Sequence, residues 1–301
     1  MYRTLMVPLD GSPLAERALP YAAALARVSG AKVYLVRAAM AHPALGSDAA
    51  EEEVVTVEAA ENYLNDVAGR LPREQVETAV FYGSPQEAIV EEISLRKVDL
   101  VVMATHGRSG LNRLLQGSVA AGVLARSPVP ILLVRAWQEE HDVTPLTAAP
   151  RLLVPLDGSP FAEAALPVAR EMAATLGGTI ELVQAVEVPH RVPSDTQEQT
   201  VRYLDQEVDG LKHDAMRYLH GVAERLKDGE ASAPPVHVGV GDPVEVISAT
   251  GRDVGAAMIV MATHGRTGLA RLLLGSVADG VLRQERLPLL LVRPEGGPQR
   301  G

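Results

Sequence analysis

The chain has 301 residues, with 28 Lys or Arg against 38 Asp or Glu, so its formal net charge is −10 at pH 7. It contains no cysteine, which excludes disulfide scaffolds, thiol catalysis and cysteine-ligated zinc. The acidic balance and the 3% of aromatic residues leave little to bind phosphate backbones or stack on bases, and we expect no nucleic-acid partner.

Short apolar runs alternate with longer helical spacing along the first half of the chain. The pattern predicts strands near residues 3–9, 32–38, 76–81, 99–103 and 129–134. Helices are predicted between them, near residues 12–28, 48–71, 85–96 and 118–126. Ser12 and Ser84 each precede a proline, which is typical of an N-cap hydroxyl before the first helical residue, and Gly30 has the place of a left-handed C-cap.

The second half of the chain repeats the first. Residues 5–20 return at 152–167, and residues 102–119 return at 260–277, in the same order. The offset grows from 147 to 158 residues, which places an insertion in the polar stretch of residues 188–235. We therefore predict two domains, residues 1–137 and residues 151–294, joined by a linker at residues 138–150.

Nearly unbroken apolar strands joined by helices are typical of a parallel sheet that is covered on both faces. The predicted fold class is doubly wound α/β, once in each repeat. In such a sheet a ligand binds beyond the carboxyl ends of the strands, where the strand order reverses. Two loops of unusual composition reach that place in each repeat, one after the first strand and one after the fourth.

These two loops have the composition of an anion site. In the first repeat they contain Asp10, Gly11 and Ser12, then Gly107, Arg108, Gly110, Gly117 and Ser118. Glycines allow close backbone approach, and the amides at a helix N-terminus, together with a serine hydroxyl, bind anions. A phosphate group fits this description, and Arg108 and Arg113 would add charge-assisted contacts.

A simpler structural interpretation stands beside each of these assignments. Asp10 and Asp157 are also ordinary turn residues before a helix, and the Gly-Ser pairs are also ordinary helix caps. His106 and His264 lie beside the glycines, but no nucleophile with a base and an orienting carboxylate is evident around them. We therefore assign no catalytic residue and no metal-binding side chain.

Both repeats resemble the universal stress protein family, whose nucleotide-binding members carry a glycine, two residues, a glycine, nine residues and then Gly-Ser or Gly-Thr. Here Gly107 and Gly265 are each followed by nine residues and a Gly-Ser pair. The first glycine of the pattern is replaced by Ala104 and Ala262, whose methyl group stands where ribose or phosphates would approach. The resemblance implies a five-stranded, Rossmann-like parallel sheet of order 3-2-1-4-5 in each repeat and a stress-response protein that binds ATP, ADP or AMP with Mg²⁺.

The resemblance and the loop composition together give the candidate binding residues. In the first repeat they are Pro8, Asp10, Gly11, Ser12, Ala38, Met103, Ala104, Gly107, Arg108, Gly110, Gly117, Ser118 and Val119. In the second repeat they are Pro155, Asp157, Gly158, Ser159, Ala185, Met261, Ala262, Gly265, Arg266, Gly268, Gly275, Ser276 and Val277.

Three functions stay open at this point. In the first, nucleotide occupancy regulates conformation or partner binding. In the second, the same loops hydrolyse ATP slowly or transfer its phosphoryl group, although the chain has no Walker lysine and no identifiable base. In the third, alanine has closed the pocket and the protein is a nucleotide-free interaction scaffold.

The expected partners follow from the edges and the surface of the fold. The fifth strands, at residues 131–134 and 289–292, would be apolar sheet edges if left open, so we expect them to pair within the chain. A further homodimer of whole chains stays open. The charged stretch at residues 196–229 is expected to be a solubilising surface. No signal peptide or apolar run of about 20 residues is evident, so we expect a cytoplasmic protein without a membrane partner.

Overall fold

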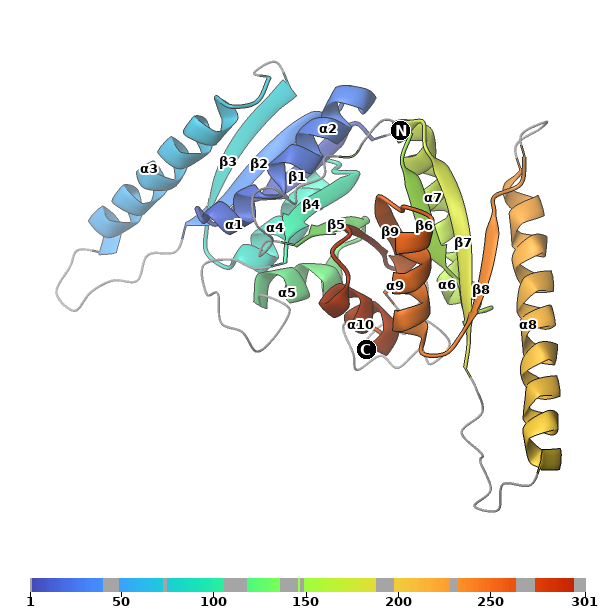
Figure 1. Cartoon of the computed structure of the whole chain (residues 1–301). Helices are drawn as coiled ribbons and strands as arrows, with labels where there is room; N and C mark the ends of the chain where they lie inside the picture. The colour runs from blue at the N-terminus through green and yellow to red at the C-terminus, as the bar shows by residue number, and fades with distance from the viewer. Residues whose placement is uncertain are drawn as a thin grey trace. The chain divides into compact units, whose positions relative to one another are not determined.

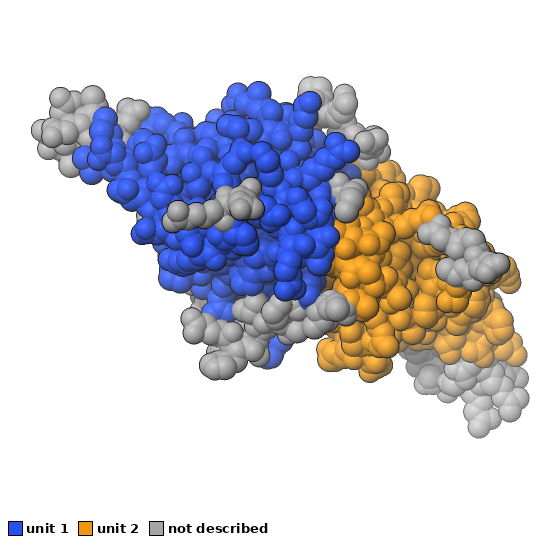
Figure 2. All heavy atoms as spheres, turned by 90° about the horizontal axis from the view of Figure 1, so that it is seen from above, with its two compact units in different colours: residues 1–148, 286–293 blue, residues 149–285, 294–301 orange. Residues whose placement is uncertain are grey.

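The computed structural model describes residues 2–39, 49–72, 75–105, 118–135, 146, 149–187, 198–227, 232–263 and 274–294. The chain divides into two compact units, which are coloured separately in Figure 2. Unit 1 comprises residues 1–148 and 286–293, and unit 2 comprises residues 149–285 and 294–301. The last strand of the chain is therefore grouped with the first repeat.

Strands and helices alternate in both units (Figure 1). The strands of unit 1 are β1 (Thr4–Pro8), β2 (Lys32–Ala39), β3 (Val76–Tyr82), β4 (Leu100–Ala104), β5 (Ile131–Val134) and β10 (Leu289–Val292). Its helices are α1 (Pro13–Glu16), α2 (Leu19–Ser29), α3 (Ala49–Ala68), α4 (Pro85–Leu95) and α5 (Ser118–Arg126). In unit 2 the strands are β6 (Arg151–Pro155), β7 (Thr179–Val186), β8 (Val236–Val240) and β9 (Met258–Ala262). Its helices are α6 (Pro160–Glu163), α7 (Ala165–Leu176), α8 (Glu198–Leu226), α9 (Pro243–Asp253) and α10 (Ser276–Gln284).

The sheet of unit 1 has the order β3-β2-β1-β4-β5, and all four of these strand pairs are parallel. This confirms the predicted order and fold class. β10 then pairs with β5 in antiparallel direction, with Leu290 opposite Leu132. In unit 2 the pairs β8-β7, β7-β6 and β6-β9 are parallel and repeat the first four positions of the same order.

Two of the central strands, β4 and β9, are buried along their whole length. Every residue of β4 and β9 is buried, and Leu100 and Met258 at their starts have no exposed surface. Such strands are apolar on both sides because helices cover both faces of a parallel sheet. This is why the strands could be predicted from short apolar runs.

The helix predicted near residues 12–28 is in fact two helices, α1 and α2. Pro20 is the reason, because a proline inside a helix lacks an N–H donor and its ring clashes with the carbonyl four residues earlier, here that of Glu16. α1 accordingly ends at Glu16. The second repeat behaves in the same way, since α6 ends at Glu163, four residues before Pro167.

The predicted helix caps are confirmed at two of three positions. Ser12 is the N-cap of α1, where its hydroxyl accepts a hydrogen bond from the amide of Ala15 at 3.2 Å. Gly30 caps α2 in the left-handed conformation, with φ of 71°. The prediction for Ser84 is wrong in one respect, because its side chain makes no capping hydrogen bond although α4 begins directly after it.

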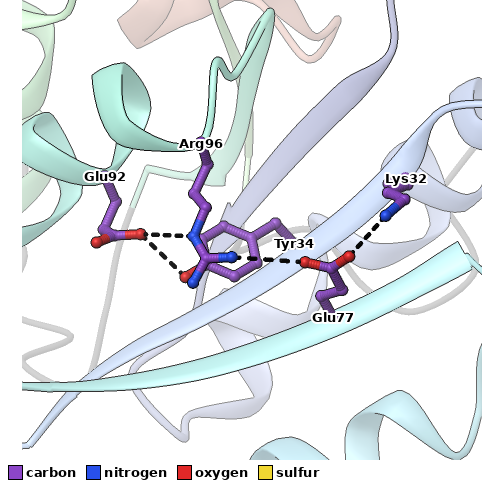
Figure 3. Close-up of polar contacts among 5 residues, drawn as sticks. All are labelled: Lys32, Tyr34, Glu77, Glu92 and Arg96. Atoms are coloured by element: carbon purple, nitrogen blue, oxygen red, sulfur yellow. Dashed lines mark hydrogen bonds and ion pairs between the residues drawn. The ribbon is translucent and has the colours of Figure 1, made fainter.

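A polar cluster ties β2, β3 and α4 together in unit 1 (Figure 3). The Tyr34 hydroxyl donates to Glu92 Oε2 at 3.0 Å, and the Arg96 guanidinium lies 5.0 Å from the centre of the Tyr34 ring. Glu77 lies between Lys32 Nζ, at 2.7 Å, and the Arg96 guanidinium, at 3.7 Å. Lys32 Nζ and the Arg96 guanidinium hold the pKa of the Glu77 carboxyl below its usual value, and the Lys32 contact has the larger effect.

Within the described ranges, no helix is both long enough and apolar enough to span a bilayer.

Candidate functional site

A cavity of about 690 Å³ lies in unit 2, beyond the carboxyl ends of β6, β7 and β9. This is the place where the strand order reverses, since β7 and β9 lie on opposite sides of β6. The volume is within the range of small-molecule sites. Nine predicted residues line the cavity, namely Pro155, Asp157, Gly158, Ala185, Met261, Ala262, Gly275, Ser276 and Val277.

The turn after β6 forms one wall of this cavity. Asp157 Oδ1 accepts a hydrogen bond from the amide of Ser159 at 2.9 Å, and Ser159 Oγ caps α6 by accepting from the amide of Ala162 at 3.2 Å. Gly158 has φ of 82°, a left-handed conformation that glycine adopts at little cost. Asp157 therefore acts as a turn residue before the helix, which is the simpler interpretation given for it above. Ser159, which is only 7% exposed, directs its hydroxyl to the cap.

The N-terminus of α10 forms another wall. Gly275 is its N-cap, and the Gly275 amide donates to the carbonyl of Thr263 at 2.7 Å. Ser276 and Val277 are the first residues of the helix, so their amides have no carbonyl partner within it. Such amides, together with the helix dipole, favour an anion at this end of the cavity.

Helix α8 supplies a third wall that the sequence analysis missed. Leu211, Asp214, Ala215 and Tyr218 from α8 line the cavity, so the interpretation of residues 196–229 as a solubilising surface is wrong for this face. The signal was present in the sequence, because buried Ala215 starts an apolar stripe with Leu219 and Val222 at helical spacing.

A hydrogen-bonded clamp joins the long helix of each unit to the short helix after the first strand. In unit 2 the Tyr218 hydroxyl donates to Glu163 Oε1 at 2.9 Å, and Arg225 donates to Glu163 Oε2 at 2.8 Å. Burial, the hydrogen bond to Glu163 and the charge of Glu163 raise the pKa of Tyr218. The clamp holds α8, and with it Tyr218, against the turn that follows β6.

The sequence matches the family model described as "Universal stress protein family" over residues 1–135 and 149–293. The chain belongs to the universal stress protein family. The universal stress protein Rv2005c of Mycobacterium tuberculosis is 30% identical over 223 residues, which cover 72% of this chain and 69% of that protein. A universal stress protein of Thermus aquaticus is 35% identical over 139 residues, which cover 45% of this chain and all of that protein.

The likeness extends to solved structures of whole tandem length. The crystal structure of a universal stress protein from Archaeoglobus fulgidus superimposes with a TM-score of 0.68 at 22% identity. The match covers 96% of this chain and 98% of that one. At this level of identity the match supports the tandem α/β fold of the family.

Unit 1 of this universal stress protein chain carries the same turn and the same clamp. Asp10 Oδ1 accepts from the amide of Ser12 at 2.9 Å, and Gly11 has φ of 83°. The Tyr63 hydroxyl donates to Glu16 Oε1 at 3.0 Å, and Arg70 donates to Glu16 Oε2 at 2.7 Å. The matching tyrosines and the matching arginines are each 155 residues apart, so most of the insertion in the second repeat precedes the clamp on α8.

The remaining candidates of unit 1 lie at the same ends of the sheet. Pro8 ends β1, Ala38 is near the end of β2, and Met103 and Ala104 end β4. Ser118 and Val119 open α5, which corresponds to Ser276 and Val277 at the start of α10. Ala104 and Ala262, in the positions of the family glycine, are 9% and 8% exposed.

Several predicted residues lie outside the described residues. They are Gly107, Arg108, Gly110, Arg113 and Gly117 in the first repeat, and Gly265, Arg266 and Gly268 in the second, together with His106 and His264. Among the residues that the structure does describe, no three His, Asp or Glu side chains form a group that could hold a metal ion.

Proposed function

We propose that the chain binds an adenine nucleotide, namely ATP, ADP or AMP. We further propose that occupancy of this site regulates the conformation of the chain or its binding to partners. The single observation that carries this proposal is the cavity of unit 2, which the predicted residues surround. One end has the amides of the α10 N-terminus, which suit phosphates. The other surfaces include Ala185, Met261 and Leu211, which suit the flat apolar faces of a purine.

The alanine that replaces the family glycine is compatible with this proposal. Ala262 lines the cavity, and about 690 Å³ is left with its methyl group in place. This volume argues against the nucleotide-free scaffold hypothesis for the second repeat, in which the alanine side chain would have filled the site. A Mg²⁺ ion that accompanies ATP would be held mainly by phosphate and water oxygens, as Mg²⁺ commonly is at nucleotide sites.

Regulation by occupancy needs only a difference in affinity between two conformations. A nucleotide that prefers one arrangement stabilises it by about 2.7 kcal/mol when its concentration is about a hundredfold its dissociation constant. Turnover of the nucleotide is not required. β10 belongs to the second repeat in sequence and pairs with β5 of the first. Through this pairing a conformational change in the second repeat would reach the first, and we include pairing of the repeats through their fifth strands in the proposal.

The proposal is tested by titrating ATP and Mg²⁺ into the purified chain in a calorimeter and by measuring the thermal unfolding midpoint. Gly275→Val places a side chain at the phosphate end, and its backbone φ of −63° accepts any residue. We expect at least a tenfold loss of affinity. Gly221→Val is the control, because Gly221 is exposed on α8 with open space around it. The proposal is wrong if the wild-type chain shows neither binding heat nor a thermal shift.

A further inference from the structure

The two crevices differ at one matched position, which holds Arg37 in the first repeat and Gln184 in the second. The backbone register shows that the positions correspond. The amide of Leu9 donates to the carbonyl of Val36 at 2.8 Å, and the amide of Leu156 donates to that of Val183 at the same distance. Arg37 and Gln184 are the next residues on β2 and β7, and both side chains are half-buried.

Gln184 offers the second crevice a group that matches the edge of an adenine base. Its side chain lines the cavity, and its Oε1 atom is buried without a hydrogen-bond partner in the described part of the chain. A side-chain amide has both a donor and an acceptor, as the adenine edge does with its amino group and ring nitrogen. A buried acceptor left unpaired is unfavourable, so a ligand that donates to it gains affinity.

Arg37 occupies the matching position in the first repeat. Its guanidinium lies over the turn after β1, with Nη2 2.9 Å and Cζ 3.0 Å from the point that a Cβ atom on Gly11 would occupy. Its Cζ atom also lies 4.8 Å from the centre of the Tyr63 ring. In unit 2 the matching residues, Gly158 and Tyr218, both line the open cavity.

We propose that the chain carries one adenine-nucleotide site, in the second repeat, because the Arg37 side chain occupies the space beside the Gly11 turn and Tyr63 where a base would bind in the first repeat. This proposal rests on the proposed function. The arginine blocks the base by its volume and also by its chemistry, since a guanidinium has five donors and no acceptor. Glutamine at the matched position leaves the second crevice open and provides an acceptor for the base.

The repeats allow an exchange experiment on the full chain, with ATP and Mg²⁺ as the probe and calorimetric stoichiometry as the readout. We expect one equivalent for the wild-type chain, two for Arg37→Gln, and at least a tenfold weaker affinity for Gln184→Arg. Arg27→Gln, which changes an exposed arginine on α2, is the control and should stay at one equivalent.

A second measurement on the wild-type chain keeps the proposal testable if a variant does not fold. Saturating ATP should slow hydrogen exchange of the amides at residues 157–159 and leave those at residues 10–12 unchanged. Two equivalents in the wild-type chain, or one equivalent in a folded Arg37→Gln variant, would overturn the proposal and leave the proposed function intact. An absence of ATP binding in both chains would instead contradict the proposed function.

Discussion

Matched residues of the two repeats often have different partners. Tyr34 on β2 corresponds to Glu181 on β7, and both side chains are buried, with 3% and 8% exposed. Tyr34 donates to Glu92 on α4, whereas Glu181 Oε2 lies 2.8 Å from His237 Nε2 on β8. Neither pairing could be predicted from the sequence, because each partner comes from an element far along the chain.

We expect the stability of the chain to depend on the ionisation of Tyr34 at alkaline pH. Burial, followed by the hydrogen bond to Glu92, raises the pKa of Tyr34 to about 12 from 10.0. The folded state therefore favours the neutral phenol, so this stabilisation is complete below pH 10 and is lost as the pH rises towards 12. Urea unfolding at a series of pH values should show a smaller loss of stability for Tyr34→Phe than for the wild-type chain across this interval.

At neutral pH the same Tyr34→Phe variant should be less stable by about 1 kcal/mol, because Glu92 loses a hydrogen-bond donor. Tyr82→Phe serves as the control, since Tyr82 is 53% exposed on β3. Parallel pH profiles for the wild-type and Tyr34→Phe chains would show that ionisation of Tyr34 is not linked to folding.

At the scale of elements, local signals located the ends of the first five strands to within two residues, whereas the partners of individual side chains depend on tertiary contacts. Buried apolar runs, and Gly or Pro at the ends of elements, can be recognised from the local sequence without knowing which residues they contact in the fold. The wall that α8 contributes was missed because the mixed charges of residues 196–229 hid the apolar stripe of Ala215, Leu219 and Val222. The difference between Arg37 and Gln184 was missed because its meaning depends on Tyr63 and the Gly11 turn, which folding brings together.

Glycines in α5 and α10 give a matched test of helix packing. A Cβ atom on Gly280 of α10 would lie 2.6 Å from Val244 Cγ2 on α9, and Val244 is a buried, stiff side chain. We expect Gly280→Ala to lower the free energy of unfolding by about 1–3 kcal/mol through overpacking. The measurement is urea unfolding monitored by circular dichroism.

The control is Gly122→Ala, at the matching position of α5. A Cβ atom there would meet the far end of the Gln86 side chain, which can move aside. Because alanine has a higher helix propensity than glycine, the free energy of unfolding of Gly122→Ala should be unchanged or higher by up to about 1 kcal/mol. Equal destabilisation of the two variants would contradict the role assigned to Val244.

The N-caps of α4 and α9 give a second matched test. Asp242 Oδ1 accepts from the amides of Val244 and Glu245 at 2.9 and 3.2 Å, whereas Ser84 makes no side-chain capping bond. Asp242→Ala should therefore cost about 1 kcal/mol of stability, and Ser84→Ala should cost a few tenths at most. Thermal unfolding of both variants checks the difference, and a larger loss for Ser84→Ala would refute the assignment.

At the scale of the whole molecule, the last strand of the chain completes the sheet of unit 1. The apolar pattern predicted that both fifth strands need cover, and the structure shows β10 against β5, with Leu132 and Leu290 fully buried. The edge was predictable because four consecutive aliphatic residues without a partner are a liability in water. Its grouping with unit 1 depends on contacts that only the folded chain reveals.

Leu290→Lys should destabilise unit 1 although residue 290 lies at the end of the second repeat. A lysine buried without a partner costs at least about 3 kcal/mol. Hydrogen exchange of the β5 amides should become faster in this variant. Gln284→Lys, on an exposed position of α10, is the control. Unchanged protection of β5 in Leu290→Lys would mean that β10 does not support the first sheet.

The pairing of β5 with β10 also sets an order of events during synthesis. Leu132 leaves the ribosome long before Leu290, its partner on the neighbouring strand. At translation rates of about 5–20 residues per second, the nascent first repeat presents an uncovered aliphatic edge for roughly 10–30 s. A premature stop codon anywhere before β10 removes the strand that pairs with β5.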